Sequence, residues 1–331
     1  MSILIIHPGA LGDVLLSLRA MRSLKRLFPQ NALLWIGKSE IGDLLLDMGE
    51  VDRTFALEGP LFSDLFCGSD QWGESTHSIL KTCSKIVCWL SDPTGVMAQN
   101  LRAYGIQSVI IQSPHDVSLT SRHFSDRYLE TLLDWKVQPV ELYDMREMVA
   151  RDEKEPPQES NDQLLALNHQ RIMIQPGSGS PHKCVDFSVL ASVVSELVEK
   201  GHECTIVEGP ADEKAVRRLC AVLPSNTYQV IRSMSLCSVA RCVSSFDLFI
   251  GHDSGLAHLS VACGVPSIVL FGPTDPDLWA PQGRHVSVIQ GEPCECPDWS
   301  SAQHCAHKRC LNISAARVTV QAERWLSVCK T

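Results

Sequence analysis

Short apolar runs alternate with amphipathic stretches along the whole chain, a pattern typical of α/β proteins with parallel sheets. In the first half, the apolar runs predict strands at 3–6, 32–36, 85–90 and 108–111. Helices are predicted between these strands, one ending at Pro29 and others at 40–47, 96–104 and 121–135.

The second half repeats the alternation more clearly. Strands are predicted at 171–175, 204–208, 228–231, 248–251 and 267–271. The helices predicted around them are 187–200, 212–223, 236–244, 255–263 and 314–328. Each half therefore reads as one doubly wound, Rossmann-like unit.

A polar stretch with two prolines separates the two halves, at 150–162, and it has too few apolar residues to join a core. The length of 331 residues also suits two domains. We therefore expect a Rossmann-like domain at 1–150, a linker at 151–168, a second Rossmann-like domain at 169–312 and a terminal helix at 313–331.

Composition narrows the class of protein. The formal net charge of −9 argues against nucleic-acid binding. No apolar run is long enough to span a bilayer, and the first residues predict a buried strand rather than a signal peptide, so we expect a cytoplasmic protein. The first helix carries four basic residues, which form either a solvated face or a docking patch for an anionic acceptor or the inner face of a membrane: Arg19, Arg22, Lys25 and Arg26.

Three loops that follow predicted strands contain unusual residues, and ligands of parallel α/β sheets bind in such loops. In the first, Gly9 and Gly12 permit close backbone approach, and Asp13 follows in the first helical turn. Asp13 either complements the helix dipole or presents a carboxylate toward the other domain. The spacing G-x-G-x-x-G of dinucleotide-binding proteins is absent here.

The second loop combines Gly177 and Gly179 with Ser178 and Ser180, and Lys183 follows. Backbone N–H groups with one ammonium suit a phosphate, although a flexible glycine–serine loop is the alternative. The Walker spacing is absent, which disfavours ATP hydrolysis.

The third loop, 251–258, opens a helix of small residues, whose free N–H groups suit a diphosphate. His258 lies one turn after Ser254 and is either a ligand contact or a semi-buried histidine. A proline- and glycine-rich loop, 271–283, follows the next strand, and Asp212 and Glu213 are candidates to accept ribose hydroxyls.

Together these motifs resemble the lipopolysaccharide heptosyltransferases, the ADP-heptose-using glycosyltransferase family 9. The resemblance spans residues 1–328 and rests on four motifs in order: Gly9-Ala-Leu-Gly-Asp-Val14, Pro176-Gly-Ser-Gly-Ser-Pro-x-Lys183, Asp253-Ser-Gly-x-Ala-His258 and Phe271-Gly-Pro-Thr-Asp-Pro276. It implies a GT-B fold, with two Rossmann-like domains facing a central cleft, the acceptor on the N-terminal domain and the donor on the C-terminal domain. It also implies that the last helix crosses back to the N-terminal domain.

The resemblance further implies an inverting transfer of heptose from ADP-heptose to the lipopolysaccharide inner core or a related bacterial surface glycan, without an obligatory metal. By the same resemblance, Asp13 is the general base and Gly9 and Gly12 shape its acceptor-side loop. The implied donor-binding residues are Ser178, Gly179, Lys183, Glu213, Asp253, Ser254, Gly255, Leu256 and His258.

Two alternatives remain at this point. A nucleotide-sugar epimerase with the same fold would form product from the donor alone, and a non-catalytic relative would bind nucleotide sugars without turnover. The chain also departs from the family after Lys183, where Cys184, Val185 and Asp186 replace the usual aromatic residue and proline. This departure leaves the donor sugar and its base open.

Four cysteines cluster near the C-terminus: Cys294, Cys296, Cys305 and Cys310. Four thiolates suit a tetrahedral structural zinc, but the spacing differs from that of paired zinc knuckles. Packed free thiols are the alternative interpretation.

Overall fold

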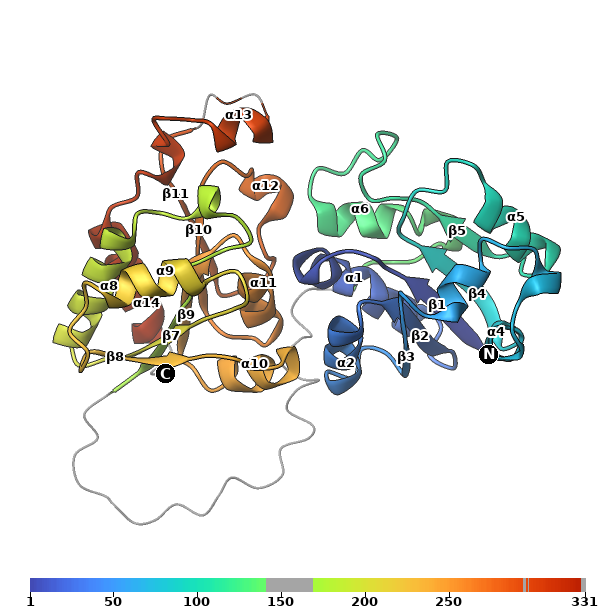
Figure 1. Ribbon diagram of the computed structural model, residues 1–331, viewed down its shortest axis with the longest axis horizontal. Helices are drawn as coiled ribbons and strands as arrows, with labels where there is room; N and C mark the ends of the chain where they lie inside the picture. Colours follow the sequence, from blue (N-terminus) through green and yellow to red (C-terminus); the bar gives the residue numbers. More distant parts are fainter. Residues whose placement is uncertain (141–168, 294–295, 297, 329–331) are drawn as a thin grey trace, which may run out of the picture. The chain divides into compact units, whose positions relative to one another are not determined.

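The computed structural model describes residues 1–140, 169–293, 296 and 298–328 (Figure 1). Contacts between Cα atoms divide the chain into two compact units, Met1–Glu141 and Leu142–Thr331. The linker predicted at 151–168 lies outside the described residues, so its boundaries stay a prediction. We describe each unit by itself.

Unit 1 is a five-stranded parallel sheet in the order β3-β2-β1-β4-β5. Its strands are β1 (Ser2–Ile6), β2 (Ala32–Gly37), β3 (Arg53–Ala56), β4 (Cys83–Cys88) and β5 (Val109–Ile111). Its helices are α1 (Leu11–Leu27), α2 (Ser39–Asp47), α3 (Pro60–Asp64), α4 (Glu74–Leu80), α5 (Val96–Ala103) and α6 (Phe124–Glu130).

Both faces of this sheet are covered, which explains why β1 is apolar from Ile3 to Ile6. Leu4 and Ile6 pack with residues of α3, α4 and α5 on one face. The intervening Ile3 and Ile5 are equally buried and point to the opposite face, because successive strand side chains alternate. Helices α1 and α6 pack against each other.

Unit 2 is a six-stranded parallel sheet in the order β11-β10-β9-β6-β7-β8. Its strands are β6 (Arg171–Ile174), β7 (Glu203–Val207), β8 (Tyr228–Ile231), β9 (Leu248–His252), β10 (Ser267–Phe271) and β11 (Val286–Gln290). Its helices are α8 (Phe187–Glu199), α9 (Glu213–Cys220), α10 (Leu236–Val243), α11 (Gly255–Ala262), α12 (Pro276–Trp279), α13 (Trp299–Gln303) and α14 (Ala315–Val328).

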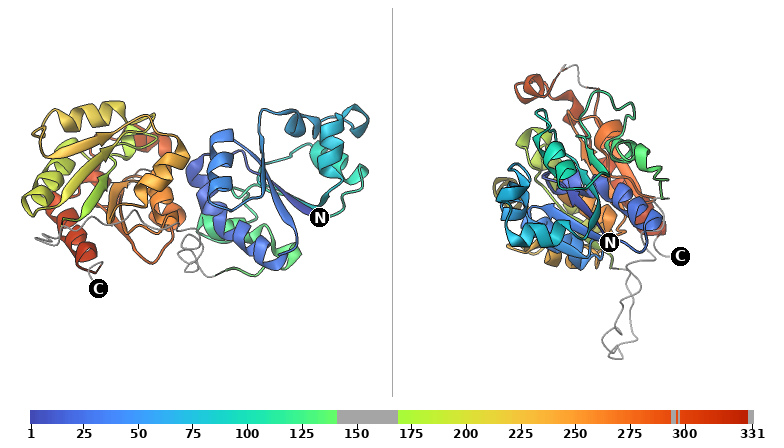
Figure 2. Two further views of the ribbon diagram at one scale, coloured as in Figure 1. Left: turned by 90° about the horizontal axis from the view of Figure 1, so that it is seen from below. Right: turned by 90° about the vertical axis from the view of Figure 1, so that its right-hand side faces the viewer.

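Successive residues of the strands in unit 2 pack into two separate hydrophobic clusters, one on each face of the sheet. Leu248 and Ile250 belong to the cluster that packs with α8, α9 and α14, whereas Phe249 belongs to the cluster of α10, α11 and α12. Figures 1 and 2 show these two groups of helices on opposite faces of the sheet. Within unit 2, α14 buries Val318 and Ala322 in the first cluster. The crossing of this last helix back to the N-terminal domain stays a prediction.

The Rossmann-like, doubly wound interpretation of both halves is confirmed, although two strands were missed. Strand β3 has only four residues and begins at a charged Arg53, so it shows no apolar run. Strand β11 lies at the sheet edge and has only one buried position, Ile289. The helix predicted at 121–135 is shorter, because after α6 the chain tightens into a 3₁₀ turn, which ends at Lys136 with a φ of 54°.

The strand orders explain where ligands can bind. In unit 1 the chain runs outward from β1 through β2 to β3, then returns to β4 on the other side of β1. In unit 2 it does the same from β6, and returns at β9. Each sheet therefore has a topological switch point, beside β1 and beside β6, and loops after these strands diverge and leave room for a ligand.

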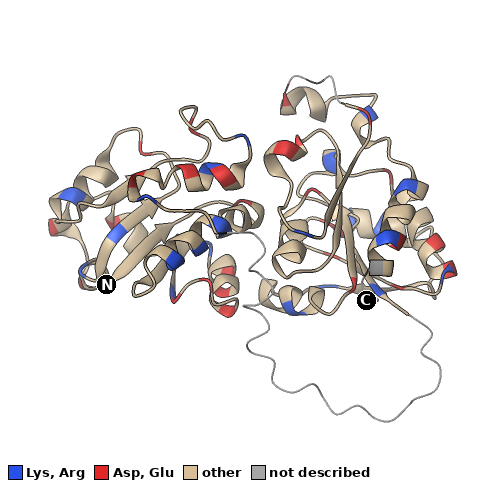
Figure 3. Cartoon of the chain, turned by 180° about the vertical axis from the view of Figure 1, so that it is seen from behind, with Lys and Arg blue, Asp and Glu red and all other residues tan. Residues whose placement is uncertain are grey.

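Three of the four basic residues of α1 have partners within unit 1. Arg19 pairs with Asp126, Arg22 pairs with Glu50, and the Lys25 ammonium donates to the Gly49 carbonyl at 3.0 Å. Figure 3 shows acidic and basic residues interspersed on both units. These contacts favour a structural role for the predicted docking patch. Among the described residues, no helix combines the length and apolarity needed to cross a membrane.

Candidate functional site

In unit 1, the loop after β1 places Asp13 in the first turn of α1. The backbone N–H of Ala10 donates to Asp13 Oδ2 at 3.1 Å, which folds the carboxylate back over the start of the helix. The side chain is half-buried, and the hydrogen bonds of the described residues engage only this one oxygen. Asp13 is therefore a dipole partner of α1, and its second carboxylate oxygen accepts no hydrogen bond from the described residues.

In unit 2, the loops after β6 and β9 meet because these two strands are neighbours. The Lys183 ammonium lies 2.7 Å from Asp253 Oδ2. The Thr274 hydroxyl, from the loop after β10, donates to the same oxygen at 2.7 Å, and the Ser178 hydroxyl donates to the Asp253 carbonyl at 2.6 Å. We call Ser178, Lys183, Asp253 and Thr274 the lysine cradle.

A buried glutamine beside the lysine cradle joins the loop after β9 to Asp212 at the start of α9. Gln175 accepts from the Ser254 hydroxyl at 2.6 Å and donates to Asp212 Oδ2 at 3.0 Å. Asp212, predicted as a ribose contact, is buried and also accepts from the Gly209 N–H at 3.0 Å, so its role here is to hold loops together. Glu213, the other predicted ribose contact, is exposed at the surface, where it pairs with Arg217. Neither Gln175 nor Thr274 was singled out from the sequence.

The start of α11 presents backbone donors at the same edge of the sheet. Ser254 is the N-cap residue, and its hydroxyl oxygen accepts from the Ala257 N–H at 3.2 Å. The N–H groups of Gly255 and Leu256 have no partner within the helix and, with the helix dipole, suit an anion. His258 follows one turn later and is buried.

The hydroxyls of this site face the protein. Ser178 donates its proton to the Asp253 carbonyl and Ser254 donates to Gln175, so neither hydroxyl proton is left for a phosphate. The donors that this geometry leaves are the backbone N–H groups and two protons of the Lys183 ammonium.

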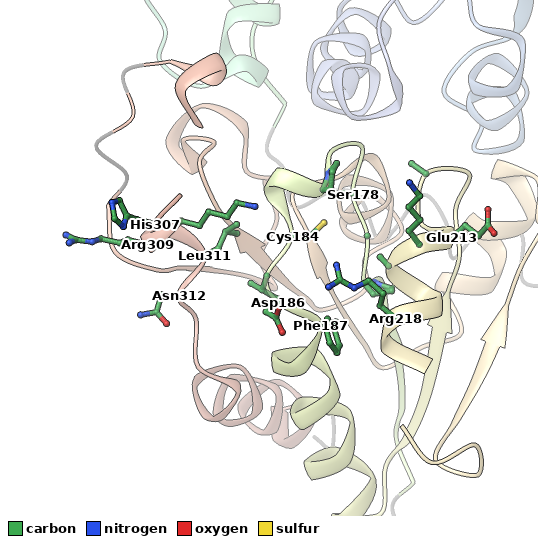
Figure 4. A pocket seen from close by; sticks show the side chains of 18 of the residues that line it. Ser178, Cys184, Asp186, Phe187, Glu213, Arg218, His307, Arg309, Leu311 and Asn312 are labelled. Atoms are coloured by element: carbon green, nitrogen blue, oxygen red, sulfur yellow. The ribbon is translucent and has the colours of Figure 1, made fainter. Parts of the chain in front are cut away.

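A pocket of about 900 Å³ in unit 2 includes part of the loop after β6, which also carries Ser178 of the lysine cradle (Figure 4). The loop after β6, the first turns of α9 and the segment 307–312 line it. It includes Gly177, Ser178 and Glu213, and its basic side chains are Lys214, Arg218, His307, Lys308 and Arg309. In Figure 4, Arg218 and Phe187 lie together at the start of α8, and the Arg218 guanidinium is 4.9 Å from the centre of the Phe187 ring.

Gly177 is required for space rather than for an unusual backbone conformation. A Cβ atom there would lie 2.0 Å from Oδ1 of the buried Asp212, whereas a Cβ at Gly179 would meet nothing within 4 Å. We expect Gly177→Ala to cost about 1–3 kcal/mol of unfolding free energy, since the contact forces the loop apart. The control Gly179→Ala should stay within about 0.5 kcal/mol. Urea unfolding measures both, and equal midpoints would show that the loop accommodates the added methyl group.

His252 ends β9 and is fully buried; its Nε2 accepts from the Val185 N–H at 3.1 Å. Burial lowers its pKa to about 4 from 6.5. Between pH 6.5 and about 4, this histidine is therefore protonated in the unfolded chain but neutral in the folded chain. The stability that the neutral His252 contributes above pH 6.5 is lost as the pH falls toward 4. We expect a slope of about 1.4 kcal/mol per pH unit from this group.

The variant His252→Gln keeps an acceptor near the Nε2 position and does not titrate. Its urea unfolding free energy between pH 6.5 and 4 should decline less steeply than that of the unmodified protein. Identical slopes would mean that His252 binds its proton equally in both states.

The cysteine cluster is only partly described. Cys294 lies outside the described residues, and among those described no group of three or more His, Cys, Asp or Glu side chains is placed to hold a metal ion. Cys310 is buried in the core with Leu311. The pKa of Cys305 is lowered mainly by hydrogen bonds from the backbone N–H groups of Lys308 and His307, and to a smaller extent by a hydrogen bond with the Cys296 side chain. Zinc at the four cysteines stays a prediction.

Comparisons with known proteins agree with these motifs. The sequence model of glycosyltransferase family 9 (heptosyltransferase) matches residues 95–308. Lipopolysaccharide heptosyltransferase 3 of Escherichia coli is 30% identical over 120 residues, which are 35% of this chain and 35% of the relative. Lipopolysaccharide heptosyltransferase 1 of Escherichia coli K12 is 34% identical over 81 residues, 24% of this chain and 25% of the relative. These alignments span about a third or less of the curated relatives.

Solved structures match over nearly the whole chain. A family 9 glycosyltransferase from Veillonella parvula has a TM-score of 0.76 at 17% identity, with 99% of this chain and 97% of that chain covered. ADP-heptose lipopolysaccharide heptosyltransferase II of Escherichia coli has a TM-score of 0.70 at 18% identity, with both chains fully covered (100%). Heptosyltransferase WaaC of Escherichia coli, solved with ADP, has a TM-score of 0.67 at 15% identity, with 98% and 100% covered. These likenesses confirm the GT-B fold.

Proposed function

This chain belongs to glycosyltransferase family 9, and from that membership we propose that it moves a heptose from ADP-heptose to a lipopolysaccharide core or a related bacterial surface glycan. The observation that carries the proposal is the lysine cradle, set beside the start of α11 at the switch point of unit 2. A diphosphate needs an ammonium and converging N–H groups, and this edge of the sheet offers both.

The donor diphosphate binds between the Lys183 ammonium and the N–H groups of Gly255 and Leu256. Asp253, itself held by the Thr274 hydroxyl, fixes the ammonium in place before the donor arrives, which reduces the reorganisation that binding requires. Glu213, exposed at the start of α9, accepts from ribose hydroxyls. His258 and Gly179 border the diphosphate and sugar.

Transfer proceeds with inversion at the anomeric carbon. An acceptor hydroxyl attacks this carbon as Asp13 takes the hydroxyl proton, because a sugar hydroxyl is a weak nucleophile until its proton has a partner. The bond from the anomeric carbon to the diphosphate oxygen breaks in the same step. The charge that develops on the diphosphate is stabilised by Lys183 and the dipole of α11. The proposal requires no metal ion for this charge.

The donor class follows from this chemistry, and the acceptor class is proposed from the relatives. The donor is a nucleoside diphosphate sugar, and the acceptor is a lipopolysaccharide inner-core sugar at the cytoplasmic face of the inner membrane. The curated relatives named above are lipopolysaccharide heptosyltransferases, which supports this acceptor class.

A thermal-shift screen tests the donor without knowledge of the acceptor. ADP-heptose and ADP should raise the melting temperature, since a ligand at 100 times its Kd stabilises the folded state by about 2.7 kcal/mol. UDP- and GDP-sugars at the same concentration should give smaller shifts. A larger shift with a UDP- or GDP-sugar would contradict the proposed donor.

A further inference from the structure

At the end of β1, His7 is enclosed by aromatic rings. The centre of its ring lies 5.7 Å from that of Trp35, 5.6 Å from that of Trp89 and 5.4 Å from that of Tyr128. Only 2% of the residue is exposed. Neither the sequence motifs nor the proposed function gives this histidine a role.

Two hydrogen bonds fix the protonation of the His7 ring. The Gly9 N–H donates to Nδ1 at 3.0 Å, so Nδ1 carries no proton. Burial lowers the pKa of His7 to about 3, so the ring is neutral at physiological pH. The single ring proton therefore lies on Nε2, which donates to the Tyr128 hydroxyl at 3.0 Å.

Gly9 connects this ring to Asp13. A Cβ atom at Gly9 would lie 2.5 Å from His7 Cε1 and 3.0 Å from Asp13 Cβ. The backbone of Gly9 is thus pressed between the histidine ring and the aspartate side chain. The next N–H, that of Ala10, donates to Asp13 Oδ2. A shift of the His7 ring would move Gly9 and then the carboxylate.

We propose that His7, oriented by Tyr128, is the positioning residue that holds the loop of Gly9 and thereby aims the Asp13 carboxylate at the acceptor hydroxyl. This inference rests on the proposed role of Asp13 as the base. His7 itself touches neither substrate, because the ring lies buried behind the loop. A base displaced by about 1 Å loses up to about 100-fold in rate, which sets the size of the effect.

Two substitutions of His7 separate its two hydrogen bonds. Asparagine places its amide oxygen near the Nδ1 position and keeps the bond from Gly9, but it leaves a cavity among the rings. Glutamine reaches toward Tyr128 and fills more space, but it loses the bond from Gly9. If kcat depended only on stability, His7→Gln would be more active than His7→Asn. If kcat depends on the position of the Gly9 loop, His7→Asn will be the more active variant.

In steady-state assays with ADP-heptose and acceptor, we expect His7→Gln to lower kcat about 10- to 100-fold, with KM for the donor within about twofold of the unmodified value. His7→Asn should retain kcat within about fivefold despite a lower melting temperature. Tyr128→Phe should lower kcat about 10-fold, since either ring tautomer then leaves a buried polar atom without a partner. NMR of ¹⁵N-labelled histidine should place the His7 proton on Nε2.

Three results would overturn the inference. They are a proton on Nδ1 of His7, kcat values that follow the melting temperatures, and unchanged kcat in both His7→Gln and Tyr128→Phe. Asp13→Asn, assayed alongside, separates the two proposals. If Asp13→Asn is inactive and the His7 and Tyr128 variants are fully active, the inference fails alone. If Asp13→Asn is active, the proposed base itself is wrong.

Discussion

Replacement of Asp13 by asparagine should reduce kcat about 1,000-fold, because general-base catalysis contributes about 10²–10⁴ and the amide cannot take a proton. Asparagine keeps the shape of the side chain and an oxygen that can accept from the Ala10 N–H. The start of α1 should therefore fold as before. Steady-state assays with ADP-heptose and a lipopolysaccharide acceptor measure the change in kcat.

Donor binding provides the control for this substitution. Asp13 belongs to unit 1, whereas the lysine cradle lies in unit 2. Calorimetric Kd values for ADP should thus agree within about twofold between Asp13→Asn and the unmodified protein. A matched acidic control is Asp43→Asn, in α2 of the same unit, which should leave kcat unchanged. Near-normal turnover by Asp13→Asn would mean that another group takes the proton.

Replacement of Lys183 by methionine should weaken binding of ADP about 10- to 100-fold, since a hydrogen bond to a charged group contributes about 1.5–3 kcal/mol. The same change removes the ammonium that lies 2.7 Å from Asp253, whose side chain is only 8% exposed. Asp253 then keeps the Thr274 hydroxyl as its partner, and we expect a loss of about 1–3 kcal/mol in stability.

A double variant separates binding from folding at this site. In Lys183→Met combined with Asp253→Asn, the buried negative charge is gone, and the amide oxygen still accepts from Thr274. Most of the lost stability should return, whereas the affinity for ADP should not. Lys200→Met is the control, because Lys200 pairs with Glu323 at the far end of α8. Recovery of ADP affinity in the double variant would show that Lys183 acts only through the fold.

The fold was readable because both sheets are covered on two faces. Strands such as β1 and β9 are buried at every position, and they stand out as apolar runs between amphipathic helices. Two of the four edge strands, β3 and β11, gave no such signal. Arg53 at the start of β3 is exposed, and β11 has only one buried position, so neither was predicted.

From the sequence, the candidate site could be predicted only as a set of loops. Gly, Ser, Lys and Asp directly after buried strands marked the right edge of the sheet. Which side chains meet there depends on strand order: Lys183 and Asp253 are 70 positions apart and touch because β6 and β9 are neighbours. Gln175 and His7 carry no pattern that distinguishes a buried bridging residue from an ordinary polar one.

Some candidate residues have hydrogen-bond partners inside the protein that the sequence pattern did not indicate. Ser178 is a predicted donor-binding residue, and its hydroxyl donates to the Asp253 carbonyl. Asp212 was expected to face a ribose, but it is buried against Gln175 and Gly209. Buried polar groups require hydrogen-bond partners, and a linear pattern does not indicate when a loop folds inward to supply them.

Mass spectrometry of the acceptor after incubation with ADP-heptose tests the proposed transfer most directly. With purified protein, ADP-heptose and a heptose-deficient lipopolysaccharide, we expect the acceptor to gain the mass of one heptose residue and one ADP to be released per transfer. An unchanged acceptor, with a new sugar nucleotide formed from ADP-heptose alone, would contradict glycosyl transfer and indicate an epimerase.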